Sequence, residues 1–264
     1  MAEKKRVVVV GARGVFGSLL VNELRDRYEV IEPARGQHDF RDAFAVACTA
    51  GPFQLLDRGI VREAVASGAH WLDIADDARW FFELVDDAEL DALARERGVV
   101  VMPGLSTLPA ISIALVHRMQ SPKKVSITLH IGNDNAKGAA AIASGAALDT
   151  PDRELLRREG IDADVRTRFE MPGVQLAMRV LAHVPIRVRT RIAKVIARMA
   201  KGFRFGTRGG FVEVRAGDRT ERISSADQRL AILPLVFALE HLPRPGVHPP
   251  TVLDANQLLQ FVSE

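Results

Sequence analysis

The stretch Val7-Val8-Val9-Val10-Gly11-Ala12-Arg13-Gly14-Val15-Phe16-Gly17 decides the fold of the N-terminal half of the chain. Four consecutive valines are typical of a strand that is buried on both faces of a parallel sheet. Three glycines follow at three-residue spacing, and the apolar residues Phe16, Leu19, Leu20 and Leu24 then recur at helical spacing. We therefore expect a strand, a glycine turn and a helix in immediate succession.

This order of elements is typical of the first unit of a dinucleotide-binding fold. The first glycine permits a tight turn, the second lets the backbone approach a pyrophosphate, and the third lets the helix pack against the strand. The N-terminus of the helix then faces the negative charge of the phosphates. The alternative is a structural turn that binds no ligand. The candidate cofactor contacts here are Gly11, Ala12, Arg13, Gly14, Val15, Phe16 and Gly17.

The composition is that of an ordinary globular protein. A chain of 264 residues can form one large domain or two small ones with a substantial core. The single cysteine excludes disulfides and thiolate zinc sites within one chain, so we expect a reducing, cytoplasmic environment. The first residues do not resemble a signal peptide, and no stretch reaches the roughly 18 apolar residues of a membrane span.

Two arginines favour NADP as the cofactor. In such folds an acidic residue after the second strand binds the ribose 2′-hydroxyl, whereas an arginine there accommodates a 2′-phosphate. Glu32 and Arg35 both follow the strand expected at 29–32, so the spacing permits NAD as well as NADP. Arg13 adds a second cation at the same corner, which favours NADP. The alternative is that Glu32 and Arg35 are ordinary surface charges.

Strands and helices alternate as far as about residue 120, which predicts a doubly wound parallel sheet. Only about ten residues separate the second strand from the apolar run at 44–50, and a strand with its crossover helix needs more. We therefore expect a trimmed sheet in which a loop crosses directly to the strand at 44–50. The further strands are expected at 71–74 and 99–102, and the helices at 55–65, 78–84, 86–97 and 110–119.

The second half of the chain has a different pattern, which predicts an α+β domain. Residues 125–131 alternate with period two, as antiparallel strands commonly do. A hairpin with a Gly-Asp turn is expected over 211–223. The expected helices are 138–148, 226–241 and 254–262. The domains predicted are 1–120 for the dinucleotide, 121–245 for substrate binding and dimerisation, and 246–264 as a tail that packs back on the first domain.

Four segments in this order resemble the saccharopine dehydrogenase-like NAD(P)-binding family. They are the glycine stretch quoted above, Thr49-Ala50-Gly51-Pro52-Phe53, Gly68-Ala69-His70-Trp71-Leu72-Asp73-Ile74-Ala75-Asp76, and Pro103-Gly104-Leu105-Ser106-Thr107-Leu108-Pro109-Ala110. The resemblance covers about residues 5 to 120, and the segment 245–250 is similar to the end of many members. Residues 121–240 match the family only loosely.

The resemblance implies a Rossmann-type domain, a second domain built on a mixed sheet, and a homodimer. It implies that Arg35 serves NADP and that Asp39 and Asp42 lie near the adenine. It also implies that Gly51, Pro52 and Phe53 flank the phosphates and ribose on the nicotinamide side. The missing strand and helix after residue 33 depart from the family pattern at the adenine pocket.

Several polar side chains are candidates for catalysis, and none is singled out by the sequence. Asp73 and Asp76 follow a strand at the carboxyl edge of the sheet, although either could cap the helix at 78. Ser106 could polarise a substrate or cap the next helix. The remaining candidates are Thr107, His130, Asn133 and Lys137. The chain has no Tyr-x-x-x-Lys pair, phosphate-binding Gly-Lys-Ser/Thr loop, zinc motif or nucleophile elbow, so no metal is expected.

The segment from Met171 to Val212 contains nine Lys or Arg residues and no acidic residue. Within 187–204, Ile192, Val195, Ile196 and Met199 share one helical face and the cations lie elsewhere. This basic amphipathic helix could make peripheral contact with an anionic membrane or bind an acidic partner. The alternative is a solvated face over a core-packed helix. Nucleic acid is not expected as a partner because no recognisable binding module is present.

Taken together, these features predict an NADP-linked oxidoreductase. It would transfer a hydride to or from a small carbonyl, imine or amine substrate. The alternative is a non-catalytic NAD(P)-binding or sensor protein whose basic helix engages a membrane or a partner.

Overall fold

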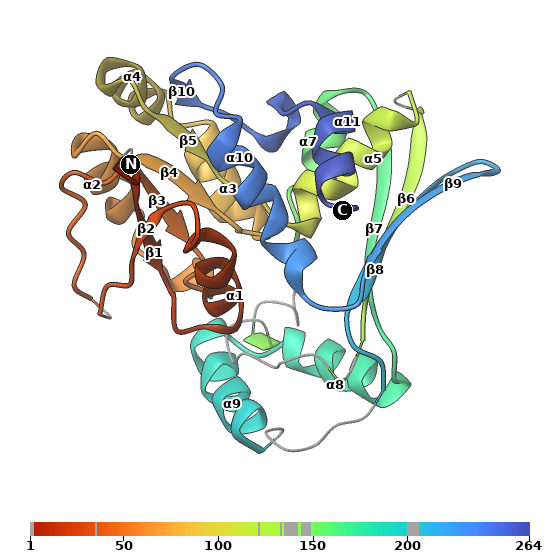
Figure 1. Cartoon of the computed structure of the whole chain (residues 1–264). Helices are drawn as coiled ribbons and strands as arrows, with labels where there is room; N and C mark the ends of the chain where they lie inside the picture. The colour runs from red at the N-terminus through yellow and green to blue at the C-terminus, as the bar shows by residue number, and fades with distance from the viewer. Residues whose placement is uncertain are drawn as a thin grey trace.

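A computed structural model describes residues 3–34, 36–120, 122–132, 134, 142–143, 149–199 and 206–264. Three of the residues discussed above, Arg35, Asn133 and Lys137, lie outside these ranges, as does most of the helix expected at 138–148. The described chain forms two sheets with helices packed between and around them (Figure 1).

The first sheet is parallel and has the strand order β10-β5-β4-β3-β1-β2. Its strands are β1 (Arg6–Val10), β2 (Glu29–Ile31), β3 (Ala45–Cys48), β4 (His70–Asp73), β5 (Val100–Met102) and β10 (Gly246–Val247). The central strands β3, β4 and β5 consist almost entirely of buried residues because helices cover both faces of the sheet. This arrangement confirms the doubly wound α/β fold.

Helices connect these strands in the expected order. They are α1 (Val15–Leu24), a 3₁₀ turn at Phe53–Leu55, α2 (Gly59–Ala66), α3 (Ala78–Val85) and α4 (Ala88–Arg97). Local chemistry sets their ends: Asp87 accepts a hydrogen bond from the Leu90 amide at the start of α4, and Gly98 ends that helix in the left-handed conformation.

The trimmed edge of the sheet is confirmed. Strand β2 lies at the edge and pairs only with β1, while β3 pairs with the other side of β1. The described residues between 32 and 44 form neither helix nor strand. A short loop therefore replaces the strand and helix that a full sheet would carry beyond β2.

The second sheet has the order β7-β6-β8-β9 and is mixed. Its strands are β6 (Lys124–Ile131), β7 (Asp162–Phe169), β8 (Gly210–Ala216) and β9 (Arg219–Ser225). Strand β6 pairs antiparallel with β8, as its alternating pattern predicts, and parallel with β7. The β8–β9 hairpin turns at Gly217-Asp218, as expected. Helix α7 (Asp152–Arg158) connects β6 to β7 and packs against β7.

The helix expected over 226–241 is wrong in its first part, residues 226–232. The structure has a 3₁₀ turn at Arg229–Ala231 and then α10 (Leu233–Glu240). The Asp227 carboxylate accepts hydrogen bonds from the Arg229 amide and side chain, which fixes a turn, and Pro234 has no amide hydrogen with which to continue an earlier helix. The helix expected from residue 110 likewise begins as a π-turn at Thr107–Ile111, followed by α5 (Ser112–Arg118).

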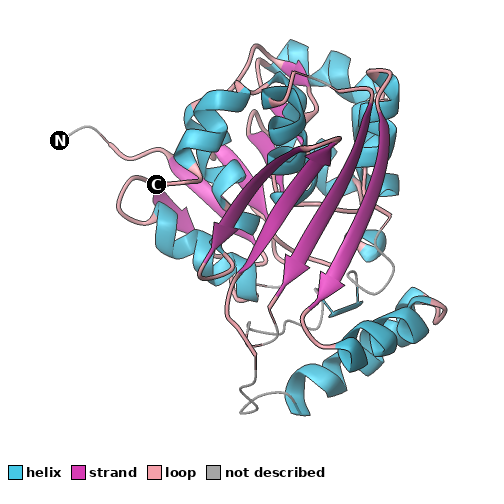
Figure 2. Ribbon diagram, turned by 90° about the vertical axis from the view of Figure 1, so that its right-hand side faces the viewer, coloured by secondary structure: helices cyan, strands magenta, loops and turns pink. Residues whose placement is uncertain are grey.

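The C-terminal part of the chain returns to the first sheet. Helix α10 packs on β4 and α1, and β10 pairs with β5 at the edge of the sheet. The last helix, α11 (Ala255–Phe261), packs against α5 and α10. Two further helices, α8 (Pro172–Ala182) and α9 (Ile186–Met199), lie beyond one end of the second sheet (Figures 1 and 2). None of the helices in the described ranges is long and apolar enough to cross a bilayer.

A buried carboxyl group joins α5 to α7. The Ser112 hydroxyl bonds Asp152 Oδ1 and also lies 2.9 Å from the Pro109 carbonyl oxygen, while Asp152 Oδ2 is buried. One hydroxyl hydrogen cannot donate to both acceptors, so a proton on Asp152 Oδ1 that is donated to Ser112 lets the Ser112 hydroxyl donate to Pro109. Burial raises the pKa of Asp152 to about 6, which agrees with this arrangement.

The Asp152→Asn substitution is expected to change how stability depends on pH. The folded protein holds the Asp152 proton more tightly than the unfolded chain, so this group lowers stability as the pH rises from 3.8 to about 6. Asp152→Asn lacks this loss of stability. Relative to that of the wild type, its free energy of unfolding should therefore rise by about 2–3 kcal/mol between pH 4 and pH 7. Urea unfolding at several pH values measures the difference. Parallel stability curves for the two proteins would contradict the assignment.

Candidate functional site

The glycine turn between β1 and α1 has the close packing that its sequence predicts. Gly11 has a φ of +88°, and a Cβ there would lie 2.8 Å from the Ala50 amide nitrogen. A Cβ on Gly17 would lie 2.1 Å from the Gly11 carbonyl oxygen. No side chain fits at either position without moving backbone. The turn therefore brings the first turn of α1, with its unpaired amides, directly to the carboxyl edge of β1.

The charged residues around this turn are exposed. Arg13 is exposed in the turn itself. Asp39 forms a two-pronged ion pair with Arg41, whose Nε lies 2.9 Å from Oδ1 and whose terminal nitrogen lies 2.6 Å from Oδ2. These hydrogen bonds lower the pKa of Asp39 to about 2. Asp42 follows with a φ of +57°. The loop after β2 thus presents Arg41, a cation that the sequence gave no reason to single out.

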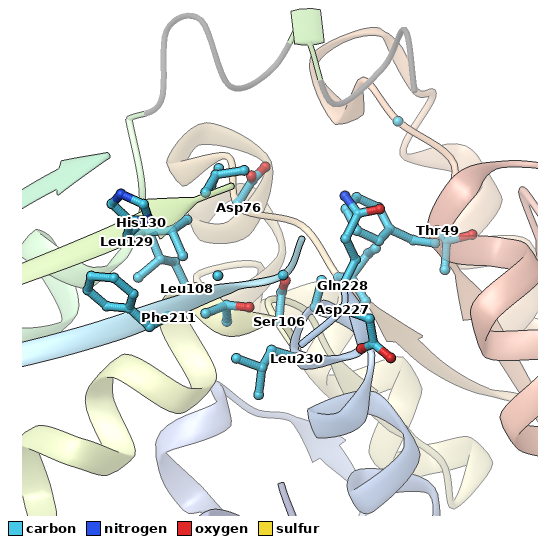
Figure 3. A pocket seen from close by; sticks show the side chains of 18 of the residues that line it. Thr49, Asp76, Ser106, Leu108, Leu129, His130, Phe211, Asp227, Gln228 and Leu230 are labelled. Atoms are coloured by element: carbon cyan, nitrogen blue, oxygen red, sulfur yellow. The ribbon is translucent and has the colours of Figure 1, made fainter. Parts of the chain in front are cut away.

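A cavity of about 190 Å³ opens where the carboxyl edge of the first sheet meets the second sheet (Figure 3). Its nucleotide-side wall contains Phe16, Thr49, Gly51 and Phe53. Its other walls are mainly apolar and carry a few polar groups, among them Asp76, Ser106, Thr107, His130, Asp227 and Gln228. Gly51 and Phe53, which were expected to flank a nicotinamide, therefore meet the catalytic candidates Asp76, Ser106, Thr107 and His130 in one cavity, although these residues come from both halves of the chain.

Asp76 is a half-buried carboxyl group in this cavity. It lies on the loop after β4, and its side chain forms no hydrogen bond with another side chain in the described part of the protein. Burial, with a smaller contribution from the nearby carboxyl groups of Asp77 and Asp152, raises the pKa of Asp76 to about 6, although a hydrogen bond from its own amide acts in the opposite direction. A carboxyl group with such a pKa can donate or accept a proton near neutral pH.

Asp73 lies three residues before Asp76 but has a different environment. It is completely buried, it does not line the cavity, and both of its oxygens accept two hydrogen bonds each. Oδ2 lies 2.9 Å from the indole nitrogens of both Trp71 and Trp80. Oδ1 accepts from the amides of Ala75 and Gly104 at 2.9 and 3.1 Å. These bonds tie β4, α3 and the loop after β5 together.

The residue that caps α3 is Asp77, and not Asp73 or Asp76. Asp77 accepts a hydrogen bond from the Trp80 amide at 2.9 Å and so caps α3, which leaves Asp76 free of that role. Ser106 precedes the π-turn without capping it through its side chain. Ser106 and Thr107 are both nearly buried and line the cavity, so their hydroxyl groups are placed to contact a bound molecule.

The second sheet forms the opposite wall. His130 on β6 stacks on Phe211 of β8, with ring centroids 4.7 Å apart, and the Arg222 guanidinium lies 3.6 Å from the centre of the Phe211 ring. Figure 3 shows His130, Leu129 and Phe211 on the side of the cavity that faces Thr49 and Gln228. The sequence predicted no site role for Phe211, Asp227 or Gln228. Only the pairing of β6 with β8 and the turn at Arg229 bring them here.

Comparisons with known proteins agree with this architecture. No protein-family model matches the chain, and no curated protein sequence matches it. The structure is similar to a mutant meso-DAP dehydrogenase from Clostridium tetani E88 with bound DAP, at 9% identity and a TM-score of 0.50, over 98% of this chain and 96% of that chain. It is also similar to a dipicolinate-bound dihydrodipicolinate reductase from Paenisporosarcina sp. TG-14, at 9% identity and a TM-score of 0.47, over 95% of this chain and 100% of that chain. At such identities, the first likeness shows a shared Rossmann-type fold.

Replacing Asp73 is expected to destabilise the protein strongly. Asp73→Ala leaves four buried N–H groups without their acceptor, so we expect a loss of about 3–5 kcal/mol in the free energy of unfolding. Urea unfolding followed by tryptophan fluorescence measures it, since both tryptophans of the chain donate to this carboxylate. Trp80→Phe removes one of the four donors, so it should lower the free energy of unfolding by less than Asp73→Ala does. A loss below about 1 kcal/mol in Asp73→Ala would show that the network is dispensable.

Proposed function

We propose that this protein is an NADP-linked oxidoreductase that transfers a hydride to or from a small carbonyl, imine or amine substrate. One observation carries the proposal: a single cavity adjoins the glycine turn and also contains the Asp76 carboxyl group, which has a raised pKa and forms no side-chain hydrogen bond among the described residues. A structural turn would not require such a cavity. An enzyme requires a cofactor site and a polarising group side by side.

The glycine turn fits a dinucleotide. Its two crowded glycines pack the turn against Ala50 and the start of α1, Gly14 would let a pyrophosphate approach the backbone, and the amides of the first turn of α1 would bind the phosphates. Phe16, Gly51 and Phe53 would hold the nicotinamide end at the cavity. Bound NADPH would supply the hydride. The remaining chemistry, which is to orient the substrate and move one proton, would fall to the side chains of the cavity.

Asp76 is the proposed proton donor. In a reduction, the carbonyl carbon gains a hydride and the carbonyl oxygen gains the proton of the Asp76 carboxyl group, which leaves a carboxylate. The reverse direction returns that proton to Asp76. Ser106 and Thr107 would hold the substrate oxygen or nitrogen, because their hydroxyl groups line the same cavity. The mostly apolar walls suit a small substrate with an apolar body.

The preference for NADP over NAD rests on cations at the glycine turn and after β2. Arg13 is exposed in the turn, and the sequence places Arg35 after β2. Arg41 lies on the same loop but is already paired with Asp39, which reduces its capacity to bind a phosphate. Arg13 and Arg35 are therefore the proposed contacts of the 2′-phosphate.

The saccharopine dehydrogenase-like resemblance supports the same proposal at a finer level. Its segments form the glycine turn, the Gly51–Phe53 wall, the Asp73 network and the Ser106 loop. The resemblance also motivates a homodimer, which stays a prediction. The second candidate function, a nucleotide sensor without catalysis, would need the same cofactor contacts but would not need Asp76.

Cofactor titration tests the first part of the proposal. Fluorescence titration should give tighter binding of NADPH than of NADH. Arg13→Ala should weaken NADPH binding about ten-fold and leave NADH binding nearly unchanged, because only NADPH carries the 2′-phosphate. Arg25→Ala is the matched control, since Arg25 is an exposed cation at the far end of α1. Tighter binding of NADH, or equal effects of the two substitutions, would contradict the assignment.

A second experiment tests the role of Asp76. A panel of carbonyl and imine compounds is screened for NADPH oxidation, and the best substrate is used with Asp76→Asn. We expect kcat to fall about 10²–10⁴-fold while NADPH affinity is unchanged, since the residue acts on the proton and not on the cofactor. In the wild type, kcat/KM for reduction should fall as the pH rises through about 6, because the acid form of Asp76 is lost.

An independent readout follows the carboxyl group itself. Carbon-13 NMR of labelled aspartate side chains should show two groups that titrate near pH 6 in the wild type, Asp76 and Asp152, and only one of them in Asp76→Asn. The exposed turn residue Asp218 serves as a control through Asp218→Asn. Unchanged kcat in Asp76→Asn would contradict its role as the proton donor, whereas NADPH binding without turnover of any compound in the panel would favour the sensor function.

A further inference from the structure

The helical pair α8–α9 exposes far more apolar surface than the rest of the described chain. Ten large hydrophobic side chains are exposed among the described residues, and eight of them lie between Met171 and Met199. The most exposed are Leu176 at 63%, Val180 at 62%, Val195 at 58% and Met199 at 70%. Exposed apolar side chains that are gathered in this way, and not scattered singly, mark a binding surface.

The apolar side chains of α9 form one stripe that the helix does not use to pack on its own protein. Val188, Ile192, Val195, Ile196 and Met199 recur at intervals of three and four residues and are all exposed. The buried residues of α9 are Arg189 and Ala193, which lie on a different side of the helix. Arg189 and Ala193 therefore form the side of α9 that packs on the rest of the protein. The stripe is an additional apolar face.

Cations accompany this stripe, and no acidic residue balances them. The cations of the helical pair outside its buried face are Arg179, Arg187, Arg191, Lys194 and Arg198. None of these five forms an ion pair within the described ranges, and the sequence from Met171 to Val212 contains no Asp or Glu. On α9, the exposed cations recur at intervals of three and four residues: Arg187, Arg191, Lys194 and Arg198. They therefore form a row along the helix beside the apolar stripe.

We propose that the α8–α9 pair docks on an anionic lipid surface. The apolar stripe would enter the boundary between headgroups and acyl chains, and the adjacent cations would contact lipid phosphates. Long arginine and lysine side chains can extend to the headgroups while their methylene groups remain in the apolar layer. The pair lies beyond one end of the second sheet (Figures 1 and 2). Docking would therefore hold the protein peripherally, without a spanning helix.

Charge favours a lipid surface over a second copy of the chain. A two-fold dimer through this face would set its cations against the same cations of the other copy, with no acidic residue of the pair to neutralise them. Anionic headgroups neutralise them all. The proposal is independent of the oxidoreductase function, because none of the residues involved lines the cavity.

Vesicle sedimentation of the full-length protein tests the docking. The wild type should pellet with vesicles of phosphatidylcholine and phosphatidylglycerol at low salt, release at high salt, and stay in solution with phosphatidylcholine alone. The double variant Val195→Asp/Met199→Asp should lose most of this binding. Arg191→Gln and Arg198→Gln should each weaken it about five-fold.

A matched control separates docking from general surface hydrophobicity. Val252 is 47% exposed and lies outside the helical pair, so Val252→Asp makes the same change at a similar exposure and should bind vesicles as the wild type does. NADPH titration and circular dichroism on every variant verify that the fold and the cofactor site are intact. Failure of the wild type to pellet at low salt, or an equal loss in Val252→Asp, overturns the proposal. Conversion of a dimer to a monomer by the double variant, seen by light scattering, also overturns it in favour of self-association.

Discussion

The Asp73 carboxylate is the interaction on which the candidate site depends most. A buried charge without partners would be costly, but this carboxylate accepts four hydrogen bonds from two indoles and two backbone amides. Through them it connects the end of β4 to α3 and to the loop after β5. Trp80 in turn packs against Phe53, with ring centroids 5.4 Å apart, so the network also supports the wall of the cavity next to the glycine turn.

The consequence is a division of roles among three nearby carboxyl groups. Asp73 is saturated with donors and holds the edge of the sheet, while Asp77 caps α3 and also accepts from Gln54. Asp76 between them has neither function, and burial among like charges raises its pKa. Environment and not residue type distinguishes them, as is usual for acid–base pairs in active sites. Asp76 is held in the cavity because the hydrogen bonds of Asp73 and Asp77 fix the backbone on both sides of it.

The second constraint is the incomplete sheet. Because no strand lies beyond β2, the loop at 32–44 forms the edge beside the glycine turn, where the two-pronged Asp39–Arg41 pair organises part of it. Asp39 is thus bound to a neighbouring arginine, whereas Glu32 at the end of β2 is exposed. The second sheet then supplies the far wall of the cavity. The amphipathic α8–α9 pair extends past that sheet with its apolar stripe uncovered.

The sequence by itself determined the local units of this protein. The Val7–Val10 run, the glycine spacing, the trimmed connection after residue 33 and the β8–β9 hairpin follow from periodicity and turn chemistry, which act within a few residues. It also offered several polar candidates for the site, among them Asp73, Asp76 and Ser106, without singling out any of them. The tertiary structure decided which of these faces a cavity. It placed Phe211, Asp227 and Gln228 in the wall, and it ended the long helix expected at 226–241. Hydrogen-bond partners, burial and strand pairing across distant segments set those outcomes, and no local pattern in the sequence records them.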